Sequence, residues 1–291
     1  MSKTRNSKEL YLILSVYLIP FFLFRIFPLL LVYILSFFKI EFWGGALSFV
    51  GLRNYIEIFL NDEIFWISIK NTFIFLILLV PSWIFLSFIL AQALYRIKHR
   101  RLILSFLILP SVVPFTILAT IWKVMYYPSI GLWSFFASFL YGKEISFLSA
   151  DLIVYGIVLM QVWTYSGYLS IIFLSGLLSI PKDYYEAANL DGANRLNILI
   201  NITIPLLKPI IFLILFITTI WSIGMIDTIY VMTGGGPAYR TSTILWHAWE
   251  TGWRFHRLGE ASSMVSIFLS LSLLIYYIER KIVGGREYIY G

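Results

Sequence analysis

Charged and hydrogen-bonding side chains gather in one stretch of this chain, residues 180–209. The stretch reads IPKDYYEAANLDGANRLNILINITIPLLKP and lies between two long apolar runs. Its charged side chains are Lys182, Asp183, Glu186, Asp191, Arg195 and Lys208. Because the stretch is polar where its surroundings are apolar, its chemistry favours a contact with another protein.

The first half of this stretch has the sequence signals of a short helix. Asp183 is the expected N-cap, and Glu186 completes a capping-box pattern three residues later. Pro181 discourages a continuous helix from the preceding apolar run. Gly192 is able to take a positive φ and to end the helix.

The second half predicts another helix over 194–204, which ends at Pro205. Arg195, Leu199 and Ile202 lie at helical spacing along it. Two interpretations remain open from the residues alone. The stretch is either a docking element that inserts into a partner's cleft or a plain amphipathic loop.

Motifs for catalysis are missing from the rest of the sequence. It contains no G-x-x-x-x-G-K-[ST], G-x-S-x-G or H-E-x-x-H pattern. The glycine-rich run Gly234, Gly235, Gly236 and Pro237 is predicted to be a tight external turn. Cysteine is absent and the three histidines are scattered, so no metal site is predicted. The chain is therefore not expected to be an enzyme.

The composition indicates the elements that must hold these residues. The 291 residues are 60% hydrophobic and 13% charged, which is typical of a polytopic membrane protein. We predict an all-α fold in one domain, 1–291, with a polar loop over 180–208. Its six membrane-spanning helices are expected at about 11–38, 73–94, 102–125, 152–174, 209–230 and 259–278.

Basic residues indicate how these spans are oriented. Lysines and arginines number thirteen on the side of the two termini, the 96–101 loop and the polar stretch, against seven on the other side. The positive-inside rule therefore places both termini and residues 180–208 in the cytoplasm. The net charge of +7 is read in the same way, as a topology signal rather than a sign of nucleic-acid binding.

Several unusual residues fall inside the predicted spans. Pro110 and Pro114 predict a broken or bent third span. Arg25 lies near the middle of the first span, where it either pairs, reaches the interface or takes part in transport. Three tryptophans lie near mid-span and either pack the bundle or form the wall of a pathway: Trp83, Trp163 and Trp221.

The polar stretch also resembles a family signature. Glu186-Ala187-Ala188, then Asp191-Gly192-Ala193 and Ile204-Pro205, resemble the EAA loop of permease subunits of binding-protein-dependent ABC importers. The likeness extends over nearly the whole chain, and it is to the carbohydrate type, similar to the maltose and glycerol-phosphate first permease subunits. Further matching segments are Phe49–Tyr55, Gln161–Trp163, Phe173–Leu177 and Tyr230–Pro237.

The resemblance implies a function and a set of partners. Such a subunit lies in the prokaryotic plasma membrane, pairs with a second permease, and forms half of a pathway for a carbohydrate. Two ATPase subunits would bind ATP and Mg²⁺, so this chain is expected to bind no cofactor. An external solute-binding protein would deliver the substrate. The EAA helix would couple ATP hydrolysis to alternating access.

Three groups of site residues follow from this interpretation. The ATPase contact is expected at Tyr184, Tyr185, Glu186, Ala187, Ala188, Asp191 and Gly192. The substrate cavity is expected at Trp163, Tyr165, Trp221 and Asp227, because sugar sites combine aromatic faces with a few polar groups. Contacts with the binding protein are expected at Gly234, Gly235, Gly236 and Pro237.

The chain departs from the family pattern at two places. Ser175 replaces a common alanine, and Leu199-Ile200-Asn201 replace an aromatic and basic residues, which leaves open how the second helix meets the ATPase. Two alternative functions remain. The first is an ion-coupled secondary transporter or channel, and the second is an ABC importer for a non-sugar solute such as glycerol phosphate. A membrane-embedded enzyme has little support, since no carboxylates or histidines align at one interface.

Overall fold

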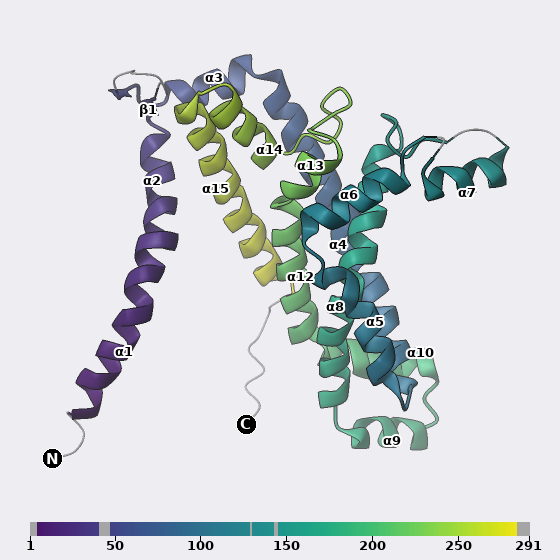
Figure 1. Cartoon of the computed structure of the whole chain (residues 1–291). Coiled ribbons are helices and arrows are strands. Elements are labelled where there is room, and N and C mark those ends of the chain that lie inside the picture. The colour runs from purple at the N-terminus through teal and green to yellow at the C-terminus, as the bar shows by residue number, and fades with distance from the viewer. Residues whose placement is uncertain (1–4, 41–46, 129, 143–144, 284–291) are drawn as a thin grey trace. The chain divides into compact units, whose positions relative to one another are not determined.

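The computed structural model describes residues 5–40, 47–128, 130–142 and 145–283 (Figure 1). Three charges used to predict the orientation, Lys3, Lys143 and Arg286, lie outside these residues. The chain divides into two compact units. One is formed by Met1–Phe65 with His247–Ser270, and the other by Trp66–Trp246 with Leu271–Gly291.

Helices make up nearly all of the described structure. In chain order the helical elements are α1 (Arg5–Phe21), η1 (Phe22–Ile26), α2 (Phe27–Leu35), α3 (Arg53–Asn61), α4 (Glu63–Arg96), α5 (Arg100–Val112), α6 (Phe115–Met125), α7 (Leu132–Tyr141), α8 (Ile153–Ser179), α9 (Lys182–Leu190), α10 (Arg195–Ile198), η2 (Leu199–Thr203), α11 (Ile204–Leu206), α12 (Lys208–Ile223), α13 (Asp227–Met232), α14 (Ile244–Trp249), η3 (Glu250–Arg254) and α15 (Leu258–Ile282). The η elements are π-helical turns. Two short antiparallel strands, β1 (Phe38–Lys39) and β2 (Ser48–Phe49), pair Phe38 with Phe49.

Five helices are long and apolar enough to cross a membrane, and a bent pair makes a sixth candidate. The five are Leu14–Leu35, Glu63–Arg96, Ile153–Ser179, Lys208–Met232 and Leu258–Ile282. This confirms the predicted polytopic helical fold. The helix α4 has 34 residues, and at ~1.5 Å per residue it is longer than the ~30 Å hydrocarbon core. The membrane-embedded part of α4 therefore stays a prediction, at 73–94.

The bent pair consists of α5 and α6, which meet at an angle of 92°. Val113 is extended (φ −67°, ψ 133°) and Pro114 precedes the first residue of α6. A proline disfavours the helical conformation in the residue before it. The predicted break in the third span is thus confirmed and lies at Pro114, whereas Pro110 stays inside α5.

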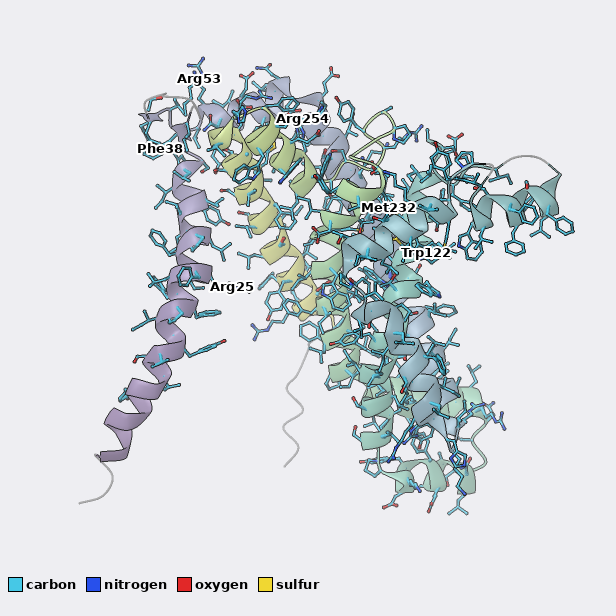
Figure 2. The ribbon with its side chains drawn as sticks, in the orientation of Figure 1. Arg25, Phe38, Arg53, Trp122, Met232 and Arg254 are labelled. Carbon is cyan, nitrogen blue, oxygen red and sulfur yellow. The ribbon has the colours of Figure 1, made fainter. Side chains whose placement is uncertain are left out.

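In the first unit, Asn54 holds the end of α2. Its side-chain amide donates to the carbonyl of Ser36 at 2.8 Å and to that of Phe38 at 3.0 Å. Ser263 of α15 donates to the same Ser36 carbonyl at 3.0 Å. These bonds satisfy backbone acceptors that the end of a helix leaves free. Arg25 lies on η1, and its side chain is exposed on the side of this helix (Figure 2).

In the second unit, two glycines of α8 allow close helix packing. A Cβ atom on Gly167 would overlap the backbone carbonyl of Leu107 on α5, and one on Gly176 would overlap side chains of Leu207 and Ile210. Small residues of this kind are common where membrane helices approach closely. They fix α5 and α12 against α8, whose far end leads into α9 (Figure 1).

Candidate functional site

The helix α9 begins earlier than the capping pattern predicts. Pro181 is its N-cap (φ −58°, ψ 139°) and no side chain caps it, so the assignment of Asp183 and Glu186 as a capping box is wrong. Proline has no N–H and a fixed φ, which suits the start of a helix, so the helix starts directly after it. Asp183 lies in the first turn instead, where its negative charge favours the helix N-terminus.

The end of α9 is as predicted. Gly192 has a φ of +75°. The N–H of Ala193 donates to the carbonyl of Ala188 at 2.9 Å, and that of Gly192 donates to Asn189 at 3.1 Å. These two bonds form a Schellman motif, which ends a helix and satisfies its last carbonyls.

One face of α9 is open. The side chains of Asp183, Glu186, Ala187 and Leu190 are exposed and follow the i, i+3, i+4, i+7 spacing of one helical face. Leu190 is 89% exposed. On the other side, Ala188 is buried and Tyr185 lies 3.5 Å from the Thr203 hydroxyl. The helix is thus anchored by one side and presents an acidic and apolar face on the other.

The segment after Gly192 is helical but irregular. Asn194 caps α10, and its Oδ1 accepts from the N–H of Asn197 at 2.8 Å. The chain then passes through the π turn η2 into α11, which contains Pro205. The predicted end at Pro205 is therefore wrong. In a π turn the hydrogen bonds shift to i→i+5, and Pro205 stands at the start of the next helical turn, where its missing N–H is tolerated.

A second candidate site is a cavity of about 300 Å³ in the unit that contains α8. It is lined by Trp83, Phe115, Gln161, Tyr165, Ile220, Trp221, Gly224, Met225, Ile226, Asp227 and Thr228. The structure therefore brings together three of the four cavity residues predicted from the sequence: Tyr165, Trp221 and Asp227. Trp83, for which the sequence left bundle packing or a pathway wall open, also lines the cavity. Phe115, Gln161 and Thr228 were not predicted.

Aromatic rings form most of the cavity wall. The ring centroids of Tyr165 and Trp221 are 4.8 Å apart, and Trp83 meets these rings edge-on at 6.1 and 6.3 Å respectively. Phe115 stacks on Tyr165 at 6.2 Å with an interplanar angle of 4°. Trp83 is fixed because its indole N–H donates to the carbonyl of Gln161 at 2.9 Å. The wall is therefore a rigid aromatic surface with few rotatable parts.

A few polar groups lie among these rings. The Gln161 amide donates to Thr228 Oγ1 at 2.7 Å and contacts Met225 Sδ at 2.9 Å. Its Oε1 is buried and accepts no hydrogen bond from the described residues. Asp227 is exposed at the N-terminus of α13. The cavity lining thus includes one buried amide and one exposed carboxylate.

Two helix breaks create this cavity. Phe115 follows the break between α5 and α6, and Gly224, Met225 and Ile226 form the break between α12 and α13. In a membrane, irregular backbone is tolerated where protein or a cavity satisfies its polar groups. The signal for the first break was Pro114, while the second lies inside the predicted span 209–230 with only Gly224 as a signal.

Trp163 lies apart from the cavity. It lies two positions before Tyr165 along α8, which corresponds to a rotation of about 200° around the helix axis. Its ring packs against Trp122 of α6 at 5.4 Å, and Trp122 stacks on Trp133 at 6.0 Å. Trp163 is 48% exposed. The structure therefore places it in a cluster of tryptophans on another face of α8.

The glycine-rich run forms a tight turn after α13. Gly234 and Gly235 have φ values of +58° and +84°. A Cβ on Gly235 would overlap the indole of Trp246. Asn71 supports the turn, because its amide donates to the carbonyls of Tyr239 at 2.7 Å and Ser242 at 2.9 Å. A cluster of hydroxyl bonds joins Thr233, Thr241 and the carbonyl of Gly236.

Pro237 and the residues that follow it form the exposed tip of this turn, up to Arg240. Gly234 is exposed with them, while Gly235 is buried. A rigid, exposed tip of this kind is suited to contact another protein.

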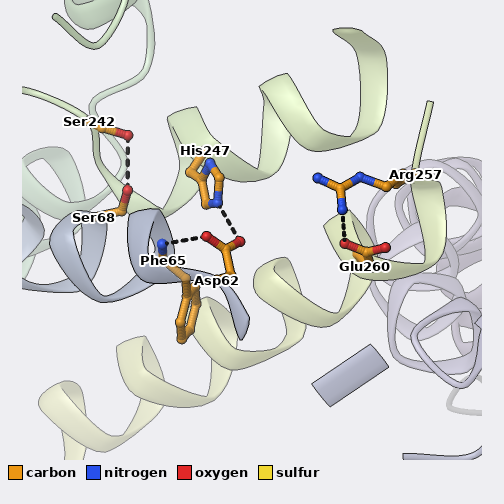
Figure 3. A network of polar contacts seen from close by, with 7 residues as sticks. All are labelled: Asp62, Phe65, Ser68, Ser242, His247, Arg257 and Glu260. Atoms are coloured by element: carbon orange, nitrogen blue, oxygen red, sulfur yellow. Dashed lines mark hydrogen bonds and ion pairs between the residues drawn. The ribbon is translucent and has the colours of Figure 1, made fainter. Parts of the chain in front are cut away.

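A buried pair in the first unit escaped the sequence analysis. His247 Nε2 lies 2.7 Å from Asp62 Oδ2, and Asp62 Oδ1 accepts from the N–H of Phe65 at 3.0 Å (Figure 3). Burial acts to raise the pKa of Asp62. The hydrogen bond and charge of His247 outweigh it, together with the backbone N–H groups of Phe65 and Ile64, so the pKa lies below its ordinary value. The residues are 185 positions apart, so no local pattern could indicate them.

Broken membrane-spanning helices around a cavity, with a short helix beyond the end of the bundle, are features found in membrane transport proteins. Residues 83–284 match the family described as binding-protein-dependent transport system inner membrane component. The chain belongs to this family.

Similar proteins and solved structures support this family assignment. The chain is 32% identical over 285 residues to the trehalose/maltose transport system permease protein MalF of Thermococcus litoralis, with 95% of each chain covered. It is 27% identical to the arabinooligosaccharides transport system permease protein AraP of Bacillus subtilis, covering 94% of this chain and 88% of AraP.

The chain is also 30% identical to the sn-glycerol-3-phosphate transport system permease protein UgpA of Yersinia pestis, and the match covers 82% of this chain and 83% of UgpA. A chain in the crystal structure of a bacterial alginate ABC transporter, in complex with alginate pentasaccharide-bound periplasmic protein, has the same fold. Its TM-score is 0.83 at 21% identity, with 96% of this chain and 95% of that chain covered.

Proposed function

We propose that this chain is one of two permease subunits of an ATP-driven importer and forms half of the pathway for a carbohydrate. The observation that carries the proposal is the aromatic cavity at the two helix breaks. Aromatic faces bind the apolar faces of sugar rings, and a few polar groups bind the hydroxyls. Relatives named for trehalose or maltose and for arabinooligosaccharides support this substrate class.

The relative named for glycerol phosphate gives a second candidate substrate. The charged residue among those that line the cavity is Asp227. A carboxylate repels a phosphate group and lowers its affinity, while it accepts hydrogen bonds from sugar hydroxyls. The lining therefore favours a neutral carbohydrate.

The exposed face of α9 is proposed to bind an ATPase subunit. Its acidic and apolar residues, with Glu186 at the centre, offer a polar contact and an apolar contact together. A second permease, two ATPase subunits that bind ATP and Mg²⁺, and an external binding protein complete the assembly. The tip at Pro237 would contact the binding protein, and α9 and both termini would lie in the cytoplasm.

The proposed mechanism is alternating access. ATP-driven closure of the ATPase subunits would move α9, and the Schellman motif and the Tyr185 contact would transmit the movement to α8 and α12. A secondary transporter or channel would need none of these partners. Co-purification of an ATPase with the chain separates the two classes.

Uptake by the reconstituted importer tests the substrate proposal. Trp221→Ala should lower ATP-dependent uptake of a maltose- or arabinose-type oligosaccharide at least about fivefold, since one aromatic contact contributes about 1–3 kcal/mol. The matched control is Trp163→Ala, which removes a tryptophan of the same helical bundle outside the cavity. Equal losses in both variants would contradict the cavity assignment, and uptake of glycerol phosphate alone would contradict the carbohydrate.

The coupling proposal has its own test. Glu186→Ala should leave the chain folded and reduce either ATPase binding or the sugar transported for each ATP hydrolysed. Glu57→Ala on α3 is the control, because this glutamate is exposed and lies in the other unit. Normal transport by Glu186→Ala would refute a coupling role for α9.

A further inference from the structure

A second, larger cavity lies beside the coupling segment. Its volume is about 710 Å³. It is lined by Phe88, Ile89, Gln92, Tyr95, Arg96, Leu177, Tyr185, Arg195, Leu196, Ile198, Leu199 and Thr203. These residues belong to the ends of α4 and α8, to α9, and to the α10–η2 segment, which meet at one end of the bundle (Figure 1).

The α4 wall of this cavity is one helical face. Phe88, Ile89, Gln92, Tyr95 and Arg96 have the spacing of residues that line a single face. Phe88 and Ile89 precede Arg96 by about two turns, or about 12 Å along the helix. The cavity is therefore apolar toward the middle of the membrane-spanning helix and basic at its end.

The other walls of the cavity also combine apolar and basic side chains. Leu177 and Leu199 add apolar surface, while Arg195 adds a second guanidinium and Tyr185 a phenol. Both arginines are exposed, so their donors are accessible. One guanidinium group can bind two phosphate oxygens through two parallel hydrogen bonds. Tyrosine side chains favour the membrane–water interface. The cavity thus combines an anion site at the interface with an apolar slot below it.

The surrounding surface is basic as well. Lys98 lies between α4 and α5, and Arg100 and Arg101 are the first residues of α5. Basic pockets between membrane helices on the cytoplasmic side recognise anionic lipid headgroups. A soluble anion would use the arginines and leave the apolar slot empty, whereas a phospholipid fills both.

We propose that this cavity binds one anionic phospholipid, with its phosphate at Arg96 and Arg195 and an acyl chain along Phe88, Ile89 and Leu199. The inference goes beyond the proposed transport function. It depends on that proposal only for which leaflet of the membrane supplies the lipid. A lipid bound there touches both α4 and the coupling segment, so it supports the position of α9 relative to the bundle.

The absence of cysteine in the chain allows a direct test. Gln92→Cys, labelled with bimane, places a fluorophore in the cavity of the full chain reconstituted with its co-purifying subunits. Two vesicle preparations contain the same mixture of phosphatidylcholine and phosphatidylglycerol. Bromine, which quenches bimane, is carried on the acyl chains of one lipid or the other at equal mole fraction. The average surface charge is therefore identical.

Brominated phosphatidylglycerol should quench the fluorophore about threefold more than brominated phosphatidylcholine, because the headgroup selects the lipid. Arg96→Gln with Arg195→Gln should remove this preference. The control pair, Arg100→Gln with Arg101→Gln, makes the same change of charge on the adjacent turn and should keep it. Arg96→Lys with Arg195→Lys should retain most of the preference, because both positive charges remain at the cavity.

Four outcomes would overturn the proposal. Equal quenching by both lipids means that lipid binding has no headgroup preference. An equal loss in the control pair means that the basic surface attracts the lipid without the cavity. If inorganic phosphate removes the preference, the cavity is a site for a soluble anion. Absence of quenching by either lipid in the assembled importer means that a protein subunit covers the cavity.

Discussion

At the scale of single residues, Gly192 determines how the coupling segment turns. Its φ of +75° lies in the left-handed region, where an L-residue with a Cβ costs about 1–2 kcal/mol. No heavy atom lies within 4 Å of the position that a Cβ would occupy. A substitution here is therefore opposed by backbone strain rather than by a steric clash.

We expect Gly192→Ala to destabilise the end of α9 by about 1 kcal/mol and to weaken coupling without affecting sugar binding. Hydrogen exchange of the α9 amides and the ratio of sugar transported to ATP hydrolysed measure the two effects. Gly192→Asn is the control, since asparagine tolerates the left-handed conformation. If alanine and asparagine behave alike, the positive φ is not what matters at this position.

The pair Asp62 and His247 makes stability depend on pH. The folded pKa of Asp62 lies below its ordinary value of 3.8. A carboxyl group with a depressed folded pKa stabilises the fold above its unfolded pKa, and this contribution is lost as the pH falls through the folded pKa. The stabilisation by Asp62 is therefore lost below about pH 4.

Asp62→Asn should lower stability at neutral pH by about 1–3 kcal/mol, the usual contribution of a hydrogen bond to a charged group. It should also reduce the fall in stability below about pH 4. Thermal unfolding of the full chain in detergent at several pH values measures both. Asp183→Asn is the control, because Asp183 is exposed on α9. A pH profile that Asp62→Asn leaves unchanged would rule out this pair as its origin.

Local structure was predictable from the sequence where a single residue determines the backbone conformation. Gly192 was identified because glycine readily adopts a positive φ, and the observed turn agrees. The cap at Asp183 failed because Pro181, two positions earlier, starts the helix itself. Tyr165 and Trp163 look equivalent in the sequence, and only the orientation of α8 assigns one to the cavity and the other to the Trp122 cluster.

At the scale of elements, the packing of α5 on α8 depends on Gly167. A Cβ at this position would overlap the carbonyl of Leu107. A backbone carbonyl cannot rotate away as a side chain does, so the two helices would have to separate. This separation would move Phe115, which follows α5 by a short break, away from Tyr165.

Gly167→Ala should therefore destabilise the protein by about 1–3 kcal/mol, as overpacking does, and should reduce sugar uptake with it. Thermal unfolding of the purified chain and uptake by the reconstituted importer are the measurements. Ser175→Ala on the same helix is the control, because Ser175 is exposed. Wild-type stability of Gly167→Ala would mean that α5 and α8 are not in contact at this point.

Elements were predictable where hydrophobicity or proline marks them. Long apolar runs indicated the spans, and Pro114 indicated the break between α5 and α6. The π turns η1, η2 and η3 were not predicted, because an i→i+5 hydrogen bond leaves no distinct signal in the hydrophobic pattern. The gap between α12 and α13 also escaped, since its sequence, Gly224-Met225-Ile226, is nearly as apolar as the helices around it.

At the scale of the whole molecule, the distribution of charge predicts which end of the bundle would meet the proposed ATPase. Thirteen basic residues on one side against seven on the other predict the orientation. Within the second unit the structure adds that α9 lies at the far end of α8 from α13 (Figure 1). The proposed coupling helix and the proposed binding-protein contact therefore belong to opposite sides of the membrane.

Single cysteines in this cysteine-free chain test that orientation. Asn189→Cys on α9 and Lys98→Cys before α5 are expected to face the cytoplasm, and Arg240→Cys after the glycine-rich turn is expected to face outside. All three positions are exposed. In intact cells a membrane-impermeant maleimide should label Arg240→Cys alone, and permeabilised cells should show labelling at the other two.

The charge rule also predicts how the outcome would change with an altered sequence. The difference between the two sides is large, so no single substitution at these sites should invert the chain. Labelling of Asn189→Cys from outside in intact cells would therefore mean that the whole bundle is inverted. In that case α9 could not reach an ATPase, and the lipid cavity at Arg96 and Arg195 would lie in the outer leaflet, so this experiment decides the orientation of both sites together.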